Sequence, residues 1–188
     1  MTDSLLSARD YVEVRFAGSG GQGVILMGVI LALAATRDRR HVVQTQSYGP
    51  EARGGYSRSD VIIANKPVDY PQLQGIDLLV ALSAQAVSRY AHLLNRQGIF
   101  IYDEDEVADL SALPAFTHAH GVPFSRLALE ETGRTQTTNI LALGAVCGIT
   151  GVVSEASLEK AALSLVPPGT EDVNLRALRR GLRVRTEV

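Results

Sequence analysis

The stretch of residues 16–24, F-A-G-S-G-G-Q-G-V, constrains this chain more than any other part of its sequence. It follows an apolar-rich run at residues 11–16 and overlaps the start of a long helical pattern at residues 22–36. A strand, a glycine turn and a helix in this order place unpaired N–H groups and the positive end of the helix dipole at the turn. Glycines also let a phosphate approach the main chain closely. The sequence therefore predicts an anion-binding turn, with free N–H groups between Gly20 and Val24.

The spacing of Gly18, Gly20 and Gly23 matches the dinucleotide-binding pattern G-x-G-x-x-G. Such a site also takes an Asp or Glu about 20 residues later, at the end of the second strand. The candidate second strand at residues 41–47 reads H-V-V-Q-T-Q-S and ends without a carboxylate, which weighs against an NAD site. Two other interpretations stay open. The glycines serve only to pack the turn, or the turn binds a phosphate-bearing ligand or the loop of a partner protein.

Strand-like and helix-like segments alternate along the chain. Strands are predicted at residues 11–16, 41–47, 58–64, 77–82, 99–102 and 116–119. Helices are predicted at residues 22–36, 84–95, 125–131, 138–149, 154–165 and 171–182. This alternation predicts an α/β fold with three α/β/α layers and a mostly parallel, Rossmann-like sheet. The C-terminal third is helical, and we expect one domain that spans residues 1–188.

Three polar, glycine-rich loops follow predicted strands, at residues 18–23, at residues 47–57 and from Ser83 onward. In an open α/β sheet, ligands bind outside the carboxyl ends of the strands. We therefore expect the three loops to converge at that edge and to form the binding site.

The loop at residues 47–57 contains most of the side chains that suit a ligand. Tyr48 and Tyr56 can each stack and donate a hydrogen bond. Arg53, which Gly54 follows, can present a planar fork of donors to a phosphate or a carboxylate. The alternative is an exposed loop whose charges are only solvated.

The composition argues against several functional classes. A net charge of −2 offers no overall field for nucleic acid or for an acidic membrane surface. The single cysteine, Cys147, cannot hold an iron–sulfur cluster or form a disulfide within the chain. Residues 1–10 lack the apolar core of a signal peptide, and no apolar stretch is long enough for a membrane span. We infer a cytoplasmic binding module without a complete catalytic apparatus.

The sequence resembles the gamma subunit of the 2-oxoacid:ferredoxin oxidoreductases. Two motifs carry the resemblance, G-S-G-G-Q-G-V at residues 18–24 and S-Y-G-P-E-A-R-G-G at residues 47–55. Weaker matches follow at residues 59–63, 69–71 and 77–81, at Asn139, at residues 143–145, at Asn174 and at Gly181. The resemblance covers roughly residues 14–181.

The resemblance implies a function in oxidative decarboxylation. Enzymes of this family convert a 2-oxoacid and coenzyme A to an acyl-CoA, carbon dioxide and reduced ferredoxin. Thiamine diphosphate and iron–sulfur clusters belong to other subunits, which agrees with the scarcity of cysteine here. The gamma portion flanks the cleft that receives coenzyme A. Its cleft residues correspond to Gly18, Gly20, Gly21, Gln22, Gly23, Tyr48, Arg53 and Gly54.

The implied partners are the alpha and beta subunits, with or without a delta subunit, and ferredoxin through the complex. A homodimer of the isolated chain stays open. Two alternatives also remain, a stand-alone nucleotide-binding dehydrogenase-like domain and a purely structural scaffold subunit. The sequence names neither the 2-oxoacid nor the number of partner subunits.

Overall fold

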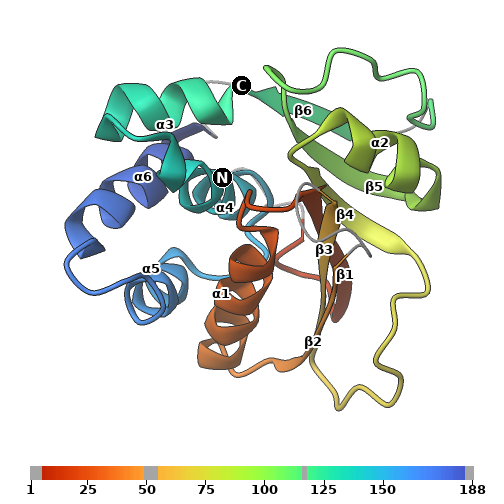
Figure 1. Ribbon diagram of the computed structural model, residues 1–188. Helices are drawn as coiled ribbons and strands as arrows, with labels where there is room; N and C mark the ends of the chain where they lie inside the picture. The colour runs from red at the N-terminus through yellow and green to blue at the C-terminus, as the bar shows by residue number, and fades with distance from the viewer. Residues whose placement is uncertain (1–5, 49–54, 116–117, 185–188) are drawn as a thin grey trace.

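A six-stranded sheet runs through the middle of the protein, and most of the helices lie against one of its faces (Figure 1). The computed structural model describes residues 6–48, 55–115 and 118–184. The strands are β1 Tyr11–Ser19, β2 His41–Tyr48, β3 Tyr56–Ala64, β4 Ile76–Ala81, β5 Leu94–Asp103 and β6 His118–Val122. The α-helices are α1 Val24–Arg37, α2 Ala84–Tyr90, α3 Phe124–Thr132, α4 Thr138–Thr150, α5 Glu155–Leu163 and α6 Glu171–Arg183. Two 3₁₀ helices are η1 Ala91–Leu93 and η2 Thr135–Thr137.

The strand order is β2-β3-β1-β4-β5-β6. The pairs β1–β4, β4–β5 and β5–β6 are parallel, whereas β3 is antiparallel to both of its neighbours, β1 and β2. Every strand except β3 therefore runs in the same direction, and the predicted mostly parallel α/β sheet is confirmed with β3 as the exception. The connection between β2 and β3 is too short for the crossover of a dozen or more residues that a parallel pair needs, so these strands form a hairpin.

The helices of the C-terminal third pack with α1 on one face of the sheet, around a shared core with side chains of β1, β4 and β5. Helix α4 lies at the centre of this layer and is buried nearly all round. It approaches α6 very closely. A Cβ atom on Gly181 would overlap the carbonyl oxygen of Leu141 and lie 2.7 Å from the amide nitrogen of Ala145. The absence of a side chain at Gly181 therefore sets the distance between the two helices.

The opposite face of the sheet is covered only in part. Helix α2 and η1 pack against β4, β5 and the end of β1, in a smaller core that includes Leu79, Phe100 and Tyr90. Figure 1 shows α2 on the side of the sheet away from α1, α4, α5 and α6. Among the described residues, no helix packs along this face of β2 and β3, although Arg89 of α2 lies over Tyr56 at the start of β3. The predicted third layer is therefore present over one half of the sheet.

Candidate functional site

The glycine turn lies between β1 and α1, as the sequence predicts. Gly21 has a φ angle of 95°, and Gly23, the N-cap of α1, has a φ angle of 75°. Residues with a Cβ rarely adopt these left-handed conformations, so glycine at both positions allows the chain to turn directly from strand to helix.

Gln22 holds the turn against the neighbouring strand. Its side-chain Oε1 accepts a hydrogen bond from the amide of Ser19 at 2.6 Å, and its Nε2 donates to the carbonyl oxygen of Leu82 at 2.8 Å. Gly18 makes room for this arrangement, because a Cβ there would lie 2.5 Å from Gln22 Oε1. Gln22 and Gly18 thus act first as structural residues that join the ends of β1 and β4.

The described ends of the three predicted loops lie close together. The amide of Gly20 donates to the carbonyl oxygen of Gly55 at 2.7 Å, which joins the glycine turn to the start of β3. The third loop leads into α2, where the guanidinium of Arg89 lies 3.8 Å from the centroid of the Tyr56 ring. Tyr48, at the end of β2, is 65% exposed. Arg53 and Gly54 lie outside the described residues.

The expectation of free N–H groups from Gly20 to Val24 is wrong at two positions. The amide of Gly20 is bonded to Gly55, and the amide of Gln22 donates to the carbonyl oxygen of Ser19 at 3.2 Å. A tertiary contact uses the first of these donors, and the turn itself uses the second.

A cavity of about 280 Å³ opens beside the turn. Its lining residues are Gly21, Gln22, Leu82, Ser125, Thr135, Gln136, Thr138 and Asn139. Gln136 and Asn139 also line a second cavity of about 260 Å³, which reaches Arg134 and the start of α6. Both volumes lie just below the usual range for ligand pockets, and the two cavities, which share Gln136 and Asn139 in their linings, are together called the groove.

The first cavity is lined by neutral side chains. The hydroxyl of Thr138 donates to the carbonyl oxygen of Thr135 at 2.7 Å, and the hydroxyl of Ser125 donates to Asp103 at 3.3 Å. Both hydroxyl oxygens therefore keep lone pairs that can accept from a ligand. Burial raises the pKa of Asp103, helped by the negative charges of Asp105 and Glu106 and opposed by its hydrogen bonds.

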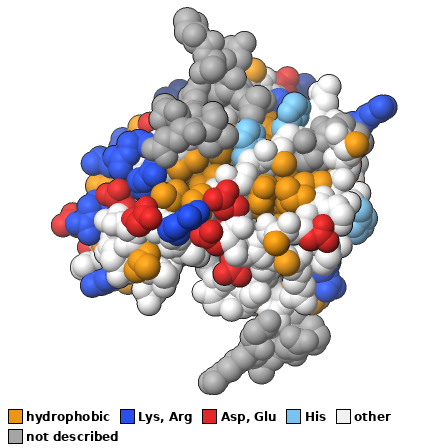
Figure 2. Space-filling model, turned by 90° about the horizontal axis from the view of Figure 1, so that it is seen from above, with side chains coloured by type: hydrophobic (Ala, Val, Ile, Leu, Met, Phe, Trp, Pro, Cys, Tyr) orange, Lys and Arg blue, Asp and Glu red, His pale blue; other side chains and the backbone are white. Residues whose placement is uncertain are grey.

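Figure 2 looks at the end of the molecule where α1 begins, and it shows basic, acidic and apolar side chains intermingled on this face. Because its lining is neutral and mostly polar, the first cavity suits a polar ligand with amide or hydroxyl groups. In the second cavity Arg134 adds a cation that suits an anionic group.

Sequence reasoning identified only part of this lining. Gly21 and Gln22 were predicted from the glycine motif, and Asn139 was singled out by the family resemblance. The contributions of Ser125 and Gln136 were missed, because they belong to segments far from the glycine motif in sequence. The polar run T-Q-T-T-N at residues 135–139, directly before an apolar helix, was the available signal.

One further observation bears on the chemistry. Cys147 is buried in α4, and burial raises the pKa of its thiol to about 12, so it stays a protonated, unreactive side chain near neutral pH.

Within residues 6–48, 55–115 and 118–184, no helix has both the length and the apolar character that crossing a membrane requires.

Comparisons with known proteins agree on one family. The model of the pyruvate ferredoxin/flavodoxin oxidoreductase family matches residues 13–184. The 2-oxoglutarate synthase subunit KorC of Methanocaldococcus jannaschii is 45% identical over 177 residues, which cover 94% of this chain and 95% of that protein. The crystal structure of a keto/oxoacid ferredoxin oxidoreductase gamma subunit from Geobacter sulfurreducens is 40% identical, with a TM-score of 0.83 over 94% of this chain and 99% of that one.

A more distant structure shares the fold. It is the 2-oxoglutarate:ferredoxin oxidoreductase from Magnetococcus marinus with 2-oxoglutarate, coenzyme A and succinyl-CoA bound. The identity is 22% and the TM-score is 0.85, and the match covers 96% of this chain and 32% of the longer one. The chain therefore belongs to the pyruvate ferredoxin/flavodoxin oxidoreductase family, in which it corresponds to the gamma subunit.

Proposed function

We propose that this chain is the gamma subunit of an oxidoreductase that converts 2-oxoglutarate and coenzyme A to succinyl-CoA, carbon dioxide and reduced ferredoxin. The observation that supports 2-oxoglutarate as the substrate is the 45% identity to a 2-oxoglutarate synthase subunit over nearly the whole of both chains. The whole chain serves as a single gamma-type domain, and the complex is cytoplasmic. The partners are alpha and beta subunits, with or without a delta subunit, and ferredoxin binds through the complex.

We also propose that the groove beside the glycine turn receives part of coenzyme A. The neutral cavity offers hydroxyl and amide groups of Ser125, Thr138 and Gln136, which match the amides of the pantetheine arm. Arg134 in the adjoining cavity is placed to pair with a phosphate. The volumes accommodate a part of coenzyme A, so a partner subunit completes the site.

The remaining predicted residues have different roles in this proposal. Gly21 and Gln22 border the ligand directly, and Gln22 also shapes the turn together with Gly18, Gly20 and Gly23. Tyr48, at the end of β2, flanks the cleft in this proposal, and Arg53 and Gly54, which lie outside the described residues, stay predictions of the family resemblance. Thiamine diphosphate and the iron–sulfur clusters belong to the partner subunits, since one buried cysteine cannot ligate a cluster.

A stand-alone dehydrogenase fits the fold poorly. In a dinucleotide-binding fold the second strand lies next to the first, and its final carboxylate binds the ribose. Here β3 separates β2 from β1, and β2 ends in Gln46, Ser47 and Tyr48. The ribose-binding carboxylate is therefore missing both from the sequence and from the expected place in the sheet.

Blocking the groove is expected to weaken the binding of coenzyme A in the assembled enzyme. Gln136 is exposed and lines both cavities, so Gln136→Trp should fill the groove without disturbing the core. We expect the KM for coenzyme A to rise about tenfold, equivalent to about 1.4 kcal/mol, while the KM for 2-oxoglutarate stays the same. Steady-state kinetics of the complex provide the measurement.

A second variant separates the groove from backbone strain. Gly21→Ala places a methyl group at the cavity, and Gly151→Ala introduces the same kind of left-handed strain at the far end of α4, where φ is 62°. We expect only the change at Gly21 to raise the KM for coenzyme A. If Gly21→Ala and Gly151→Ala change the KM for coenzyme A equally, and Gln136→Trp does not change it, the proposal that the groove binds coenzyme A is wrong. The chain would then be a structural scaffold subunit.

A further inference from the structure

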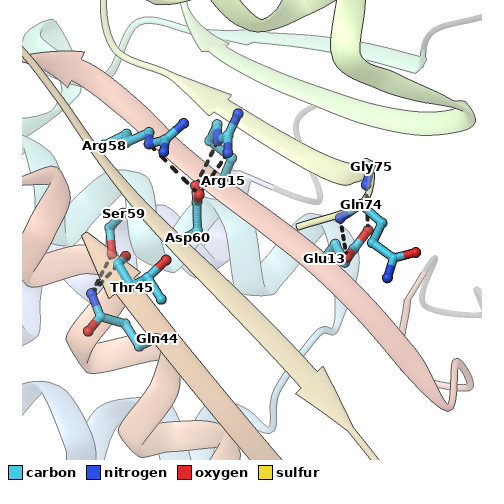
Figure 3. Close-up of polar contacts among 9 residues, drawn as sticks. All are labelled: Glu13, Arg15, Gln44, Thr45, Arg58, Ser59, Asp60, Gln74 and Gly75. Atoms are coloured by element: carbon cyan, nitrogen blue, oxygen red, sulfur yellow. Dashed lines mark hydrogen bonds and ion pairs between the residues drawn. The ribbon is translucent and has the colours of Figure 1, made fainter. Parts of the chain in front are cut away.

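On the face of β2 and β3 along which no described helix packs, two charged side chains, Arg15 and Asp60, are nonetheless buried. We call this pair the floor. Asp60 on β3 lies directly opposite Arg15 on β1 and Thr45 on β2 in the strand register. Arg15 donates from its Nε and one terminal nitrogen to the two carboxylate oxygens of Asp60, at 2.7 Å each (Figure 3). The other side of this guanidinium is covered, since it lies 4.7 Å from the centroid of the Tyr90 ring. The pair is thus rigid and nearly dry, with 7% and 8% of the two side chains exposed.

A second buried acid fixes the wall above this floor. Glu13 on β1 accepts hydrogen bonds from the amides of Gln74 and Gly75, at 2.8 and 2.9 Å (Figure 3). These bonds hold the segment before β4 across the sheet. Floor and wall enclose an open cavity of about 600 Å³. Its lining includes Arg15, Thr45, Ser47, Arg58, Asp60 and Leu93.

Among the side chains that line the cavity, Arg58 adds a second cation to the Arg15–Asp60 pair. Its Nε lies 3.9 Å from Asp60 Oδ2, an oxygen already bonded to Arg15 at 2.7 Å. Two arginines therefore face one aspartate, and within the described residues Asp60 is the only acid within ion-pair distance of Arg58. The Arg58 side chain is 37% exposed, so its terminal nitrogens can reach a group that enters the cavity.

The rim indicates a protein partner. Leu93 lines the cavity and is 42% exposed. Contact of its apolar surface with water is unfavourable, and a small bound anion would not bury that surface. Arginine is enriched at the centre of protein interfaces, and the exposed leucine beside it offers apolar surface that a protein partner would bury. Thr45, Gln46 and Ser47 on the edge strand β2 supply polar groups around them.

We propose that this cavity docks a partner subunit of the oxidoreductase, and that a partner Asp or Glu side chain enters it to form an ion pair with Arg58. The proposal is argued from charge. Arg15 and Asp60 already neutralise each other, so a carboxylate that enters the cavity would pair with Arg58. The proposal rests on the chain being one subunit of a complex. It does not depend on where coenzyme A binds, because the cavity lies on a different part of the molecule from the glycine turn.

Reversing the charge of Arg58 tests the proposal in the purified complex. The dissociation constant of the chain for its partner subunits is measured for the wild type, Arg58→Glu, Arg58→Lys and the control Arg96→Glu, which changes an exposed arginine that lines another pocket. We expect Arg58→Glu to weaken binding about 30-fold or more, as loss of a buried interfacial charge pair does. Arg58→Lys should lose less because it keeps the charge, and Arg96→Glu should bind as the wild type does.

Two readouts keep the result interpretable. The melting temperature of the free chain shows whether each variant is folded. A photoreactive p-benzoylphenylalanine at Leu93 should cross-link a partner subunit identified by mass spectrometry, whereas the same group at Arg96, the exposed position of the control variant, should not.

An unchanged dissociation constant in a folded Arg58→Glu chain would overturn the proposal, as would the absence of a cross-link from Leu93. If millimolar phosphate or citrate raises the melting temperature only when Arg58 is present, and partner binding is unchanged, the cavity binds a small anion instead. An altered KM for coenzyme A in Gln136→Trp is independent of all these outcomes, so failure of the docking proposal and failure of the coenzyme A proposal are distinguishable.

Discussion

Gly181→Ala is expected to destabilise the folded chain severely, although alanine is the better helix former. The added Cβ would meet only backbone atoms, namely the carbonyl oxygen of Leu141, the amide nitrogen of Ala145 at 2.7 Å and the Cα of Gly144 at 3.0 Å. Backbone cannot move aside as a flexible side chain can, so α4 and α6 must separate. Overpacking costs about 1–3 kcal/mol where side chains can adjust and occasionally more. Because only backbone could move here, we expect a cost above that range, which exceeds the gain of about 1 kcal/mol in helix propensity. Urea unfolding of the free chain measures the difference.

A matched variant separates steric overlap from backbone effects. Gly133→Ala places a Cβ where no other atom lies within 4 Å, at a φ angle of 71°. It should cost only the left-handed strain, about 1–2 kcal/mol. If Gly181→Ala is as stable as the wild type, the close packing of α4 on α6 is not the feature that organises the helical layer.

Asp60→Ala is expected to destabilise the chain by about 3–5 kcal/mol, because it leaves the buried guanidinium of Arg15 without its counter-charge. This loss of stability is the penalty for leaving one buried charge unpaired. It is larger than the net contribution of the intact pair to the free energy of unfolding. The double variant Arg15→Met/Asp60→Leu should therefore recover much of the lost stability. Denaturant unfolding of the two single variants and the double variant measures this coupling.

Arg58→Ala is the internal control for the buried pair. Arg58 contacts the same carboxylate at 3.9 Å but is 37% exposed, so its loss should change the unfolding free energy by less than about 1 kcal/mol. A large effect at Arg58 with a small effect at Asp60 would contradict the assignment of Arg15–Asp60 as the structural pair. It would also contradict the proposal that Arg58 is available to pair with a carboxylate of a partner subunit.

Most of the elements were predictable because their patterns are strong. The apolar run of α1 and the polar breaks on both sides of α4 place both helices to within two residues of their observed starts. The start of β5 was missed, because Asn95, Arg96 and Gln97 are exposed and do not look like a strand. They lie in a register shift of the β4–β5 pair, between the pairing of Ile76 with Leu94 and that of Leu78 with Ile99, so no regular strand pattern marks them.

The direction of β3 was predictable but was not predicted. The connection from Tyr48 to Tyr56 is too short for a crossover, so a hairpin was the only sterically simple solution. The consequence is large, because the hairpin inserts β3 between β2 and β1 and removes the place where a dinucleotide ribose would bind.

The proximity of the loop ends was predictable from the sequence, whereas the lining of the candidate site was predictable only in part. The rule that ligands bind at the carboxyl ends of parallel strands sufficed to bring the glycine turn, Gly55 and Leu82 together. Pairing of Arg15 with Asp60 depends on strand register, and the roles of Ser125 and Gln136 depend on how the helical layer packs. These relations involve residues far apart in the chain, and no local pattern reports them.

The rate of ferredoxin reduction with 2-oxoglutarate and coenzyme A, measured with and without this chain, tests most directly whether it is a gamma subunit. We expect the isolated chain to be colourless and inactive, because its one cysteine is buried and cannot hold a cluster. Partner subunits without the chain should lack the coenzyme A-dependent rate, and adding the wild-type chain should restore it. Reduction of a viologen dye by the isolated chain with any 2-oxoacid, or an equal coenzyme A-dependent rate in its absence, would contradict this function.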